Sequence, residues 1–357
     1  MTSEEMHNVG TIAGTPSVIK QANMLLIKEY IQKNPMTTKS QIAKETQLSL
    51  VTVGKIVDEL EQSGEVAVAG YRDSTGGRKA KQYVIDVSFG TVITILIRSG
   101  CYYVRLRDID GNNISNYKEN HGQESWTEEL FTVIAQAKMR AANEVCAVAL
   151  AVPGTVSEGM VTNIPLIPEW EGVNLGKILE EHFEIPAIVE NDINASTLGS
   201  YENYGNDTVK NMLFLYLGEG IGAGVVIDNK LYKTKRNFVG ELGFMNIGKW
   251  DEQKQGASSL EAVVKNLVRE NRREDLADLV ARLLVNTCCV IDPDLIVIDS
   301  DYLTQQDLAA IKNAFIHHLG AEYVPEFKVM QVGEKVYSKG LFILYKNTVP
   351  RAVRILG

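Results

Sequence analysis

The sequence has 357 residues, 45% of them hydrophobic, and a formal net charge of -9. These values indicate a globular chain of two or three domains and argue against a protein that coats nucleic acid along its whole length. No run of about 18 apolar residues occurs, and the first ten residues lack the basic and apolar segments of a signal peptide. The four cysteines form no CxxC pair, so we expect a reduced, cytoplasmic protein without a membrane segment.

A small DNA-binding domain is predicted for residues 18–86, after a flexible N-terminus over residues 1–17. Apolar residues first recur at helical spacing, and two shorter helices follow, with Thr38 and Ser49 as their N-caps. Residues 65–86 then predict two strands around a basic, glycine-rich turn. Three helices followed by a β-hairpin are typical of a winged helix-turn-helix.

The second helix of such a motif lies in the major groove, with its first residues facing the bases. Thr52 can bond a base edge or a phosphate, Lys55 suits a phosphate, and Leu50 can contact a thymine methyl group. Basic side chains on the glycine turn suit a minor groove. The predicted DNA-binding residues are Ser49, Leu50, Thr52, Lys55, Arg72, Arg78 and Lys79. A small helical domain that binds protein is the alternative, but two capped helices followed by a basic hairpin favour double-stranded DNA.

From about residue 87 the pattern changes to strands that alternate with helices, which indicates α/β architecture with internal sheets. The expected strands are TVITILI, CYYVRLRDIDG, VCAVALAVPG, AIVEND, MLFLYLG, AGVVIDNKLY and LIVID. The expected helices cover residues 126–143, 175–183, 193–204 and 258–290, and further helices close the chain.

Candidate ligand-binding residues stand at the end of AIVEND, the edge at which α/β sheets bind ligands. Asp192 could accept a proton from a substrate hydroxyl, as phosphoryl transfer requires, and Asn191 suits vicinal hydroxyls. Alternatively, Asp192 simply caps the following helix. Glu241 and Glu261 could add carboxylates that accept from hydroxyls, although exposed glutamates are commonly only solvated.

The stretch LGEGIGAGV, residues 217–225, places four glycines at alternate positions between two expected strands. A dinucleotide-binding loop would open a helix instead, which excludes that interpretation. A glycine turn between strands could cradle phosphate, as in actin-like kinases. The alternative is a plain hairpin turn, which needs fewer glycines.

The motifs occur in a family-specific order. They are TTKSQIAKETQLSLVTVGKIVDELEQSGEV, STGGRKAKQYVID, AVPGTV, IVENDINASTLGSY, LYLGEGIGAGVVIDNKLY, FVGELG and DPDLIVID. This order resembles the ROK family of repressors, open reading frames and sugar kinases, from about residue 18 to the end. The winged helix is typical of the repressor branch, which regulates the use of xylose, N-acetylglucosamine and glucose.

The resemblance implies a two-lobed, actin-like (ribonuclease H-like) module over residues 87–357, whose first lobe covers about 87–192. It implies a sugar effector in the cleft, a homodimer or tetramer on operator DNA, and a repressor of carbohydrate-use genes. By motif it assigns sugar contacts to Asn163, Asn191, Asp192, Glu241 and Glu261. Asp192 would hold the position of the kinases' catalytic base.

Several positions depart from the kinase pattern. Leu96 stands where the kinases keep the aspartate of their phosphate loop, and Asp299 and Glu219 add negative charge where phosphates would lie. Phe244 replaces the family histidine, and NIGKWDEQKQGASSLEA offers no cysteine or histidine to a structural zinc ion. We therefore expect no catalytic residue in use, no ATP and no zinc. The alternatives are an active kinase fused to a DNA-binding domain, and a regulator whose sugar module is vestigial.

Overall fold

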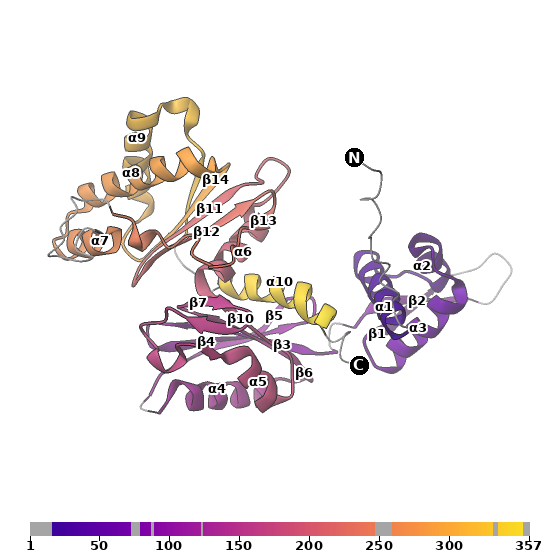
Figure 1. The fold of residues 1–357 in the computed structure, drawn as a ribbon. Helices are drawn as coiled ribbons and strands as arrows, with labels where there is room; N and C mark the ends of the chain where they lie inside the picture. Colours follow the sequence, from indigo (N-terminus) through magenta and orange to yellow (C-terminus); the bar gives the residue numbers. More distant parts are fainter. Residues whose placement is uncertain are drawn as a thin grey trace, which may run out of the picture. The chain divides into compact units, whose positions relative to one another are not determined.

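The chain forms two compact units in the computed structural model, which describes residues 16–72, 79–86, 89–122, 124–246, 259–330 and 335–352 (Figure 1). The smaller unit comprises Met1–Gly90 and Asn347–Gly357, and the larger unit comprises Thr91–Lys346. None of the helices in the described ranges is both long and apolar enough to cross a lipid bilayer.

The N-terminal part of the smaller unit consists of three helices followed by a two-stranded antiparallel sheet. Its elements are α1 (Pro16–Lys33), α2 (Lys39–Thr46), α3 (Leu50–Gln62), β1 (Val66–Arg72) and β2 (Ala80–Ile85). A capping box between Thr38 and Gln41 begins α2, and the Ser49 side chain caps α3 by accepting from the Thr52 backbone N–H. Apolar residues recur every three or four positions along α3 and bury one face in a core shared with α1 and the hairpin.

The first lobe of the larger unit is built on a sheet with the strand order β10-β6-β3-β4-β5. Its strands are β3 (Thr91–Arg98), β4 (Cys101–Asp108), β5 (Asn113–Asn120), β6 (Val145–Val152) and β10 (Ala187–Asn191). One face packs against α4 (Trp126–Arg140) and α5 (Leu175–Phe183), which Figure 1 shows side by side beneath the sheet. A small sheet of β7 (Thr155–Ser157), β8 (Met160–Thr162) and β9 (Val173–Asn174) follows β6, with the short helix η1 (Pro168–Trp170) before β9.

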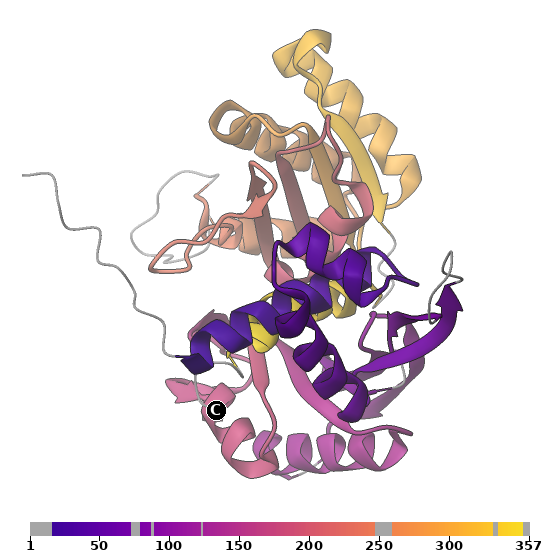
Figure 2. The ribbon, with the colours of Figure 1, turned by 90° about the vertical axis from the view of Figure 1, so that its right-hand side faces the viewer.

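The second lobe has a sheet with the strand order β13-β12-β11-β14-β15. Its strands are β11 (Met212–Leu217), β12 (Ile221–Ile227), β13 (Lys230–Leu231), β14 (Leu295–Ser300) and β15 (Glu326–Met330). Helices α7 (Leu260–Arg269), α8 (Arg273–Ile291) and α9 (Gln305–Leu319) cover one face, and short helices η2 (Leu242–Phe244) and η3 (Ala321–Tyr323) lie in its connections. Figure 2 shows α4 and α9 at opposite ends of this unit, as Figure 1 does.

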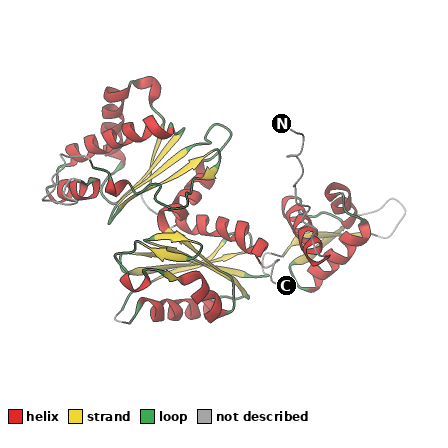
Figure 3. Cartoon of the chain, viewed as in Figure 1, coloured by secondary structure: helices red, strands yellow, loops and turns green. Residues whose placement is uncertain are grey.

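Two helices lie between the sheets of the lobes, α6 (Asp192–Tyr204) and α10 (Lys335–Ala352), so each sheet has helices on both faces (Figure 3). They cross at glycines. A Cβ atom on Gly199 would lie 1.9 Å from the carbonyl oxygen of Val336, and one on Gly340 would lie 1.8 Å from that of Ala195. Only glycine permits this approach of two backbones.

The two-lobed α/β architecture predicted from the sequence is confirmed. The order of the strands and helices also follows the prediction, with differences at the ends: the first helix begins at Pro16, and the expected helical stretch 258–290 divides into α7 and α8. The prediction missed β5, β15 and the small sheet β7-β8-β9. β5 has the sequence NISNYKEN and lies at an exposed edge of the sheet. Because its residues are mostly polar, they contain no apolar run that would predict a strand.

Candidate functional site

Four of the predicted DNA-binding residues, Ser49, Leu50, Thr52 and Lys55, lie at the start of α3 and in its first turns. The Leu50 and Val51 side chains are 55% and 70% exposed, and Lys55 is exposed on the same helix. Thr52 is half-buried, and its hydroxyl lies 2.8 Å from the hydroxyl of Ser49. Ser49 is therefore the cap that starts this helix, and the residues beside it are presented to solvent.

The hairpin adds basic residues to the smaller unit. Arg72 ends β1 and Lys79 precedes β2, both exposed, whereas Arg78 lies outside the described residues. Beside α2 and the hairpin is a groove of about 470 Å³, which sequence reasoning missed. Its lining residues are Thr38, Lys39, Ser40, Tyr71, Lys79, Ala80, Lys81 and Tyr83. Lysines beside a helix N-terminus are suited to a phosphate of a nucleic-acid backbone.

In the larger unit, a cavity of about 30 Å³ lies between the lobes at the carboxyl end of β10. It is lined by Thr155, Val156, Asn191, Ile193, Asn194, Gly222, Ala223, Asn237, Val239, Gly240 and Glu241. Two of the five predicted sugar-binding residues, Asn191 and Glu241, are thus brought together here. Such a volume accommodates about two water molecules.

Asn191 fixes the local structure at this edge. Its Oδ1 accepts from the Asn194 backbone N–H at 2.9 Å and caps α6, and its Nδ2 donates to the Gly154 carbonyl at 3.0 Å. The alternative interpretation that Asp192 caps the helix is therefore wrong, because Asp192 is the first residue inside α6. Asn194 follows one turn later, and its Nδ2 donates to Glu190.

Asp192 does not line the cavity but forms a buried ion pair. Its Oδ2 lies 3.2 Å from Nη2 of Arg98, at the end of β3, and its Oδ1 accepts from the Ile193 N–H. Burial raises the pKa of Asp192, and the charge of Arg98 opposes the rise. The Arg98 guanidinium also lies 4.5 Å from the centre of the Tyr216 ring, a cation–π contact between the lobes.

Further carboxylates surround Arg98 from the second lobe. Asp299, at the end of β14, is buried, and its Oδ1 has no hydrogen-bond partner among the described residues. Burial, together with the charges of Asp301 and Asp192, raises the pKa of Asp299 to about 7 against the opposing charge of Arg98. The Tyr216 hydroxyl donates to Asp301 at 3.4 Å. Arg98 thus pairs with Asp192 and feels the charge of Asp299, at the position where the sequence departs from the phosphate loop of kinases.

Two of the four glycines of LGEGIGAGV, Gly218 and Gly224, are explained by close packing. Gly218 to Gly220 form the tight turn between β11 and β12, with exposed Glu219 at its tip. A Cβ on Gly218 would lie 2.2 Å from the Tyr216 hydroxyl, and one on Gly224 would lie 1.8 Å from the Thr197 hydroxyl of α6. These glycines let side chains and a helix pack directly on the sheet, which favours the hairpin interpretation.

Of the remaining residues that the sequence singled out, Glu241 lines the cavity, whereas Glu261, Phe244 and Asn163 do not. Burial raises the pKa of Glu241, and the charges of Asp192 and Glu261 add to the rise. Glu261, in the first turn of α7, pairs with Lys265 and does not line the cavity. Phe244 is 63% exposed. Asn163 is exposed in a turn, where its N–H donates to Glu171, and it does not line the cavity either.

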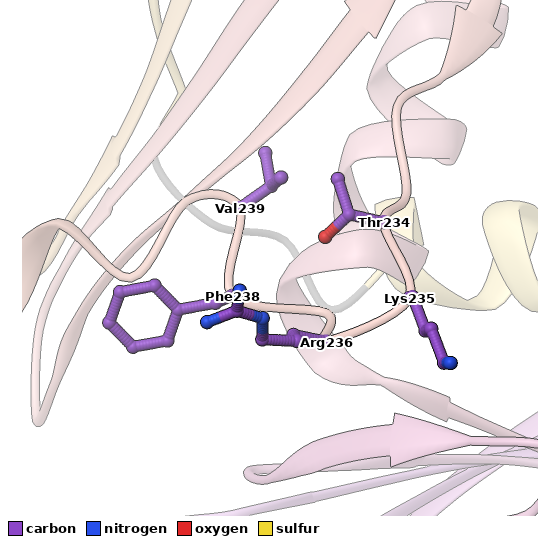
Figure 4. A pocket seen from close by; sticks show the side chains of 5 residues that line it. All are labelled: Thr234, Lys235, Arg236, Phe238 and Val239. Carbon is purple, nitrogen blue, oxygen red and sulfur yellow. The ribbon is translucent and has the colours of Figure 1, made fainter.

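A segment between β13 and η2 crosses from the second lobe to the first. Lys233 Nζ lies 2.9 Å from Glu190 Oε2, and Asn237 Nδ2 donates to the Val156 carbonyl at 2.7 Å. Its outer side borders an open hollow of about 680 Å³, where Lys235 and Phe238 point in different directions (Figure 4). The hollow is lined by Thr234, Lys235, Arg236, Phe238 and Val239.

Sequence reasoning missed three residues of this region: Arg98, Asn194 and Asn237. Arg98 could have been noticed because it lies in LIRSG, two positions after Leu96. Asn237 belongs to a loop without a motif. Within the described ranges, no cluster of three or more His, Cys, Asp or Glu residues is suited to a metal ion. Most of the segment in place of the zinc loop, residues 247–258, lies outside those ranges.

The two lobes, with a cavity at the carboxyl end of β10, define a protein of the actin-like sugar-kinase fold. A model of the ROK family matches residues 97–258. The xylose repressor of Caldicellulosiruptor bescii is 29% identical over 250 residues, which cover 67% of this chain and 62% of that repressor. The DNA-binding transcriptional dual regulator NagC of Escherichia coli (strain K12) is 24% identical over 272 residues, 72% of this chain and 66% of NagC. Residues 97–258 thus match the ROK family, and over two thirds or more of its length the chain is similar to a xylose repressor and to NagC.

Solved structures show the same fold. A ROK family transcriptional regulator, a homologue of the Escherichia coli MLC protein, matches with a TM-score of 0.73 at 16% identity over 95% of this chain and 98% of its own. A ROK family glucokinase from Streptomyces griseus, solved with glucose and AMPPNP, matches with a TM-score of 0.58 at 20% identity over 72% of this chain and 100% of its own. In sequence, the chain spans about three fifths of the length of the xylose repressors that it matches.

Proposed function

We propose that the chain is a sugar-responsive transcriptional repressor of carbohydrate-use genes. The observation that carries this proposal is the capped helix α3, whose first turn exposes Leu50 and Val51 and which is followed by a hairpin with basic residues at its ends. That surface suits the major groove of double-stranded DNA. The names of the relatives support the same function: xylose repressor and DNA-binding transcriptional regulator.

The proposed effector is a sugar in the cavity between the lobes, and the active form is a cytoplasmic homodimer or tetramer on operator DNA. Half-sites must be spaced by whole helical turns. A hinge motion of the lobes that changes the spacing of two DNA-binding domains in an oligomer would therefore release the operator.

We also propose that the protein is not a kinase. The phosphates of a nucleotide would have to enter a space where Arg98 already pairs with Asp192, and where Asp299 and Asp301 would repel them. A general base must be able to reach the hydroxyl from which it takes a proton. Asp192 is instead buried and engaged by Arg98 and the Ile193 N–H.

A gel-shift assay of the full chain with the DNA upstream of its own operon tests the proposal. We expect binding at low salt, where contacts to phosphates are strongest. Absence of a shift at low salt would contradict DNA binding. An ATP-turnover assay with a panel of hexoses should detect no reaction, and turnover that is lost in Asp192→Asn would show an active kinase.

A ligand-independent regulator with a vestigial sugar module is the second candidate. Phe244 favours it, because a phenyl ring replaces the family's histidine and cannot hydrogen-bond a hydroxyl. Thermal unfolding in the presence of a sugar library separates the two candidates. A ligand that binds only the folded state raises the unfolding temperature, so stabilisation by one sugar supports an effector site.

A further inference from the structure

The polar groups that line the cavity divide into those already engaged and those available to a ligand. The Asn191 side chain is engaged at both ends, by the α6 cap and the Gly154 carbonyl. Within the described residues, no hydrogen bond reaches Oδ1 of Asn194, Oδ1 of Asn237 or the carboxylate of Glu241. All three available groups are acceptors, so they are suited to the hydroxyl hydrogens of a ligand.

Asp192, in contrast, is already engaged by protein groups and is not available to a ligand. Its Oδ2 faces Arg98 at 3.2 Å, and its Oδ1 accepts from the Ile193 N–H at 2.9 Å and lies 3.4 Å from Nδ2 of Asn191. The carboxylate is buried and lines no part of the cavity. A ligand hydroxyl could hydrogen-bond to Asp192 only by displacing the buried Arg98 side chain. Arg98 would then lack its ion-pair partner.

We propose that Arg98 keeps Asp192 out of effector binding, and that Asn237, with Asn194 and Glu241, binds the hydroxyl groups of the effector instead. The inference rests on the proposed function, because it concerns the effector site of that regulator. The class of ligand is a neutral polyhydroxy compound, an unphosphorylated sugar. No lysine or arginine lines the described cavity, and an anionic group would face Glu241.

The size of the cavity adds a requirement. About 30 Å³ is far below the volume of a typical small-molecule pocket, roughly 300–1,000 Å³, so a sugar enters only if the walls move. The segment Thr234–Gly240 forms one wall, held by the Asn237 contact to the Val156 carbonyl and by a hydrogen bond from the Ala223 N–H to the Gly240 carbonyl, next to the Lys233 ion pair with Glu190. When Asn237 leaves the Val156 carbonyl, its amide offers a donor as well as an acceptor, which suits adjacent hydroxyls.

The test is isothermal titration calorimetry of the full chain with D-xylose, D-glucose, N-acetyl-D-glucosamine and glucose 6-phosphate. For the sugar that binds, we expect Asn237→Ala to weaken binding tenfold or more, because each lost hydrogen bond leaves a buried hydroxyl unpaired. Asp192→Asn should change the dissociation constant less than threefold. Asn116→Ala, an exposed asparagine on edge strand β5, is the matched control and should behave like the wild type.

Deoxy analogues of the sugar separate a direct contact from a structural effect. The hydroxyl bound by Asn237 is the one whose removal weakens binding to the wild type but not to Asn237→Ala. Loss of binding in Asp192→Asn together with unchanged binding in Asn237→Ala would overturn the inference. Binding of none of the neutral sugars, or tighter binding of glucose 6-phosphate than of glucose, would also overturn it.

A gel shift without sugar keeps the two proposals distinguishable. If DNA is bound and a sugar binds, but Asp192→Asn rather than Asn237→Ala loses it, the regulator stands and only its proposed effector contacts fail. If DNA is bound and no sugar binds, the ligand-independent regulator is favoured. If the sugar binds as expected but no DNA is shifted, the assigned contacts stand and the proposed function fails.

Discussion

The crossing of α6 and α10 provides a sharp prediction for the stability of the larger unit. In Gly199→Ala the new methyl group would lie 1.9 Å from the Val336 carbonyl oxygen, 2.7 Å from its carbon and 3.0 Å from the Gly340 nitrogen. All three obstacles are backbone atoms of α10, so no side chain can turn away to make room. Ordinary van der Waals contacts begin near 3.4 Å, and the two helices must therefore separate by about 1.5 Å.

Overpacking a well-packed interior costs about 1–3 kcal/mol, and a clash with a backbone belongs at the upper end of that range. Separation of the helices also loosens the core that Ala195, Tyr337 and Leu341 share with the first sheet. We expect Gly199→Ala to lower the free energy of unfolding by about 3 kcal/mol. For a unit of the size of Thr91–Lys346, that corresponds to a fall of about 6–12 °C in the unfolding temperature.

Differential scanning calorimetry of the full chain measures this shift. Gly220→Ala is the matched control, because a Cβ at Gly220 meets no atom within 4 Å and the backbone there does not require glycine. The control should unfold within about 2 °C of the wild type. If Gly199→Ala and Gly220→Ala unfold at the same temperature, the helices are not packed backbone to backbone and the reasoning fails.

Three further predictions concern a cap, a titrating group and a DNA contact. Ser49→Ala removes the cap of α3 and should cost about 1 kcal/mol, seen as roughly fivefold faster amide hydrogen exchange in α3; unchanged exchange would contradict the cap. The pKa of Asp299 is raised to about 7 in the folded state, so its carboxyl stays protonated there while it ionises in the unfolded chain above about pH 4. The free energy of unfolding should therefore fall as pH rises between about 4 and 7, by at most about 1.4 kcal/mol per pH unit. Urea unfolding at pH 5 and 7.5 should therefore show a smaller loss in Asp299→Asn than in the wild type, and equal losses would refute the assignment. Lys55→Ala should reduce the slope of log K against log salt for operator binding by about 1. The control Lys118→Ala, on edge strand β5, should leave the slope unchanged. Equal slopes for both variants would show that Lys55 does not contact a DNA phosphate.

The sequence predicted the features that depend on local chemistry. Thr38 and Ser49 predicted the starts of α2 and α3, because a short polar side chain before a periodic run of apolar residues caps a helix. The run LIVID predicted β14, because a strand that is buried on both faces has a continuous run of apolar residues. Such features need no knowledge of distant parts of the chain.

The features that the sequence did not reveal depend on long-range contacts. Strand β15 pairs with β14 across a helix, and its sequence EFKVM is too short and mixed to stand out. Arg98 looks like a surface arginine until the fold brings Asp192 and Tyr216 to it from other elements. Asn237 gains its place only because a loop of the second lobe reaches the Val156 carbonyl of the first.

The centre around Arg98 bears on how this chain could evolve. By the kinase pattern, a phosphate loop here would require a small residue in place of Arg98 and an aspartate in place of Leu96. Removing Arg98 first would leave the buried Asp192 carboxylate without its partner, at a cost of about 3–5 kcal/mol. Introducing an aspartate at position 96 first would bury a charge in an apolar cluster of Ala149, Ala151, Ala195, Tyr337 and Leu341. Either substitution alone should yield a less stable protein, so selection for stability opposes a kinase-type phosphate loop in this chain.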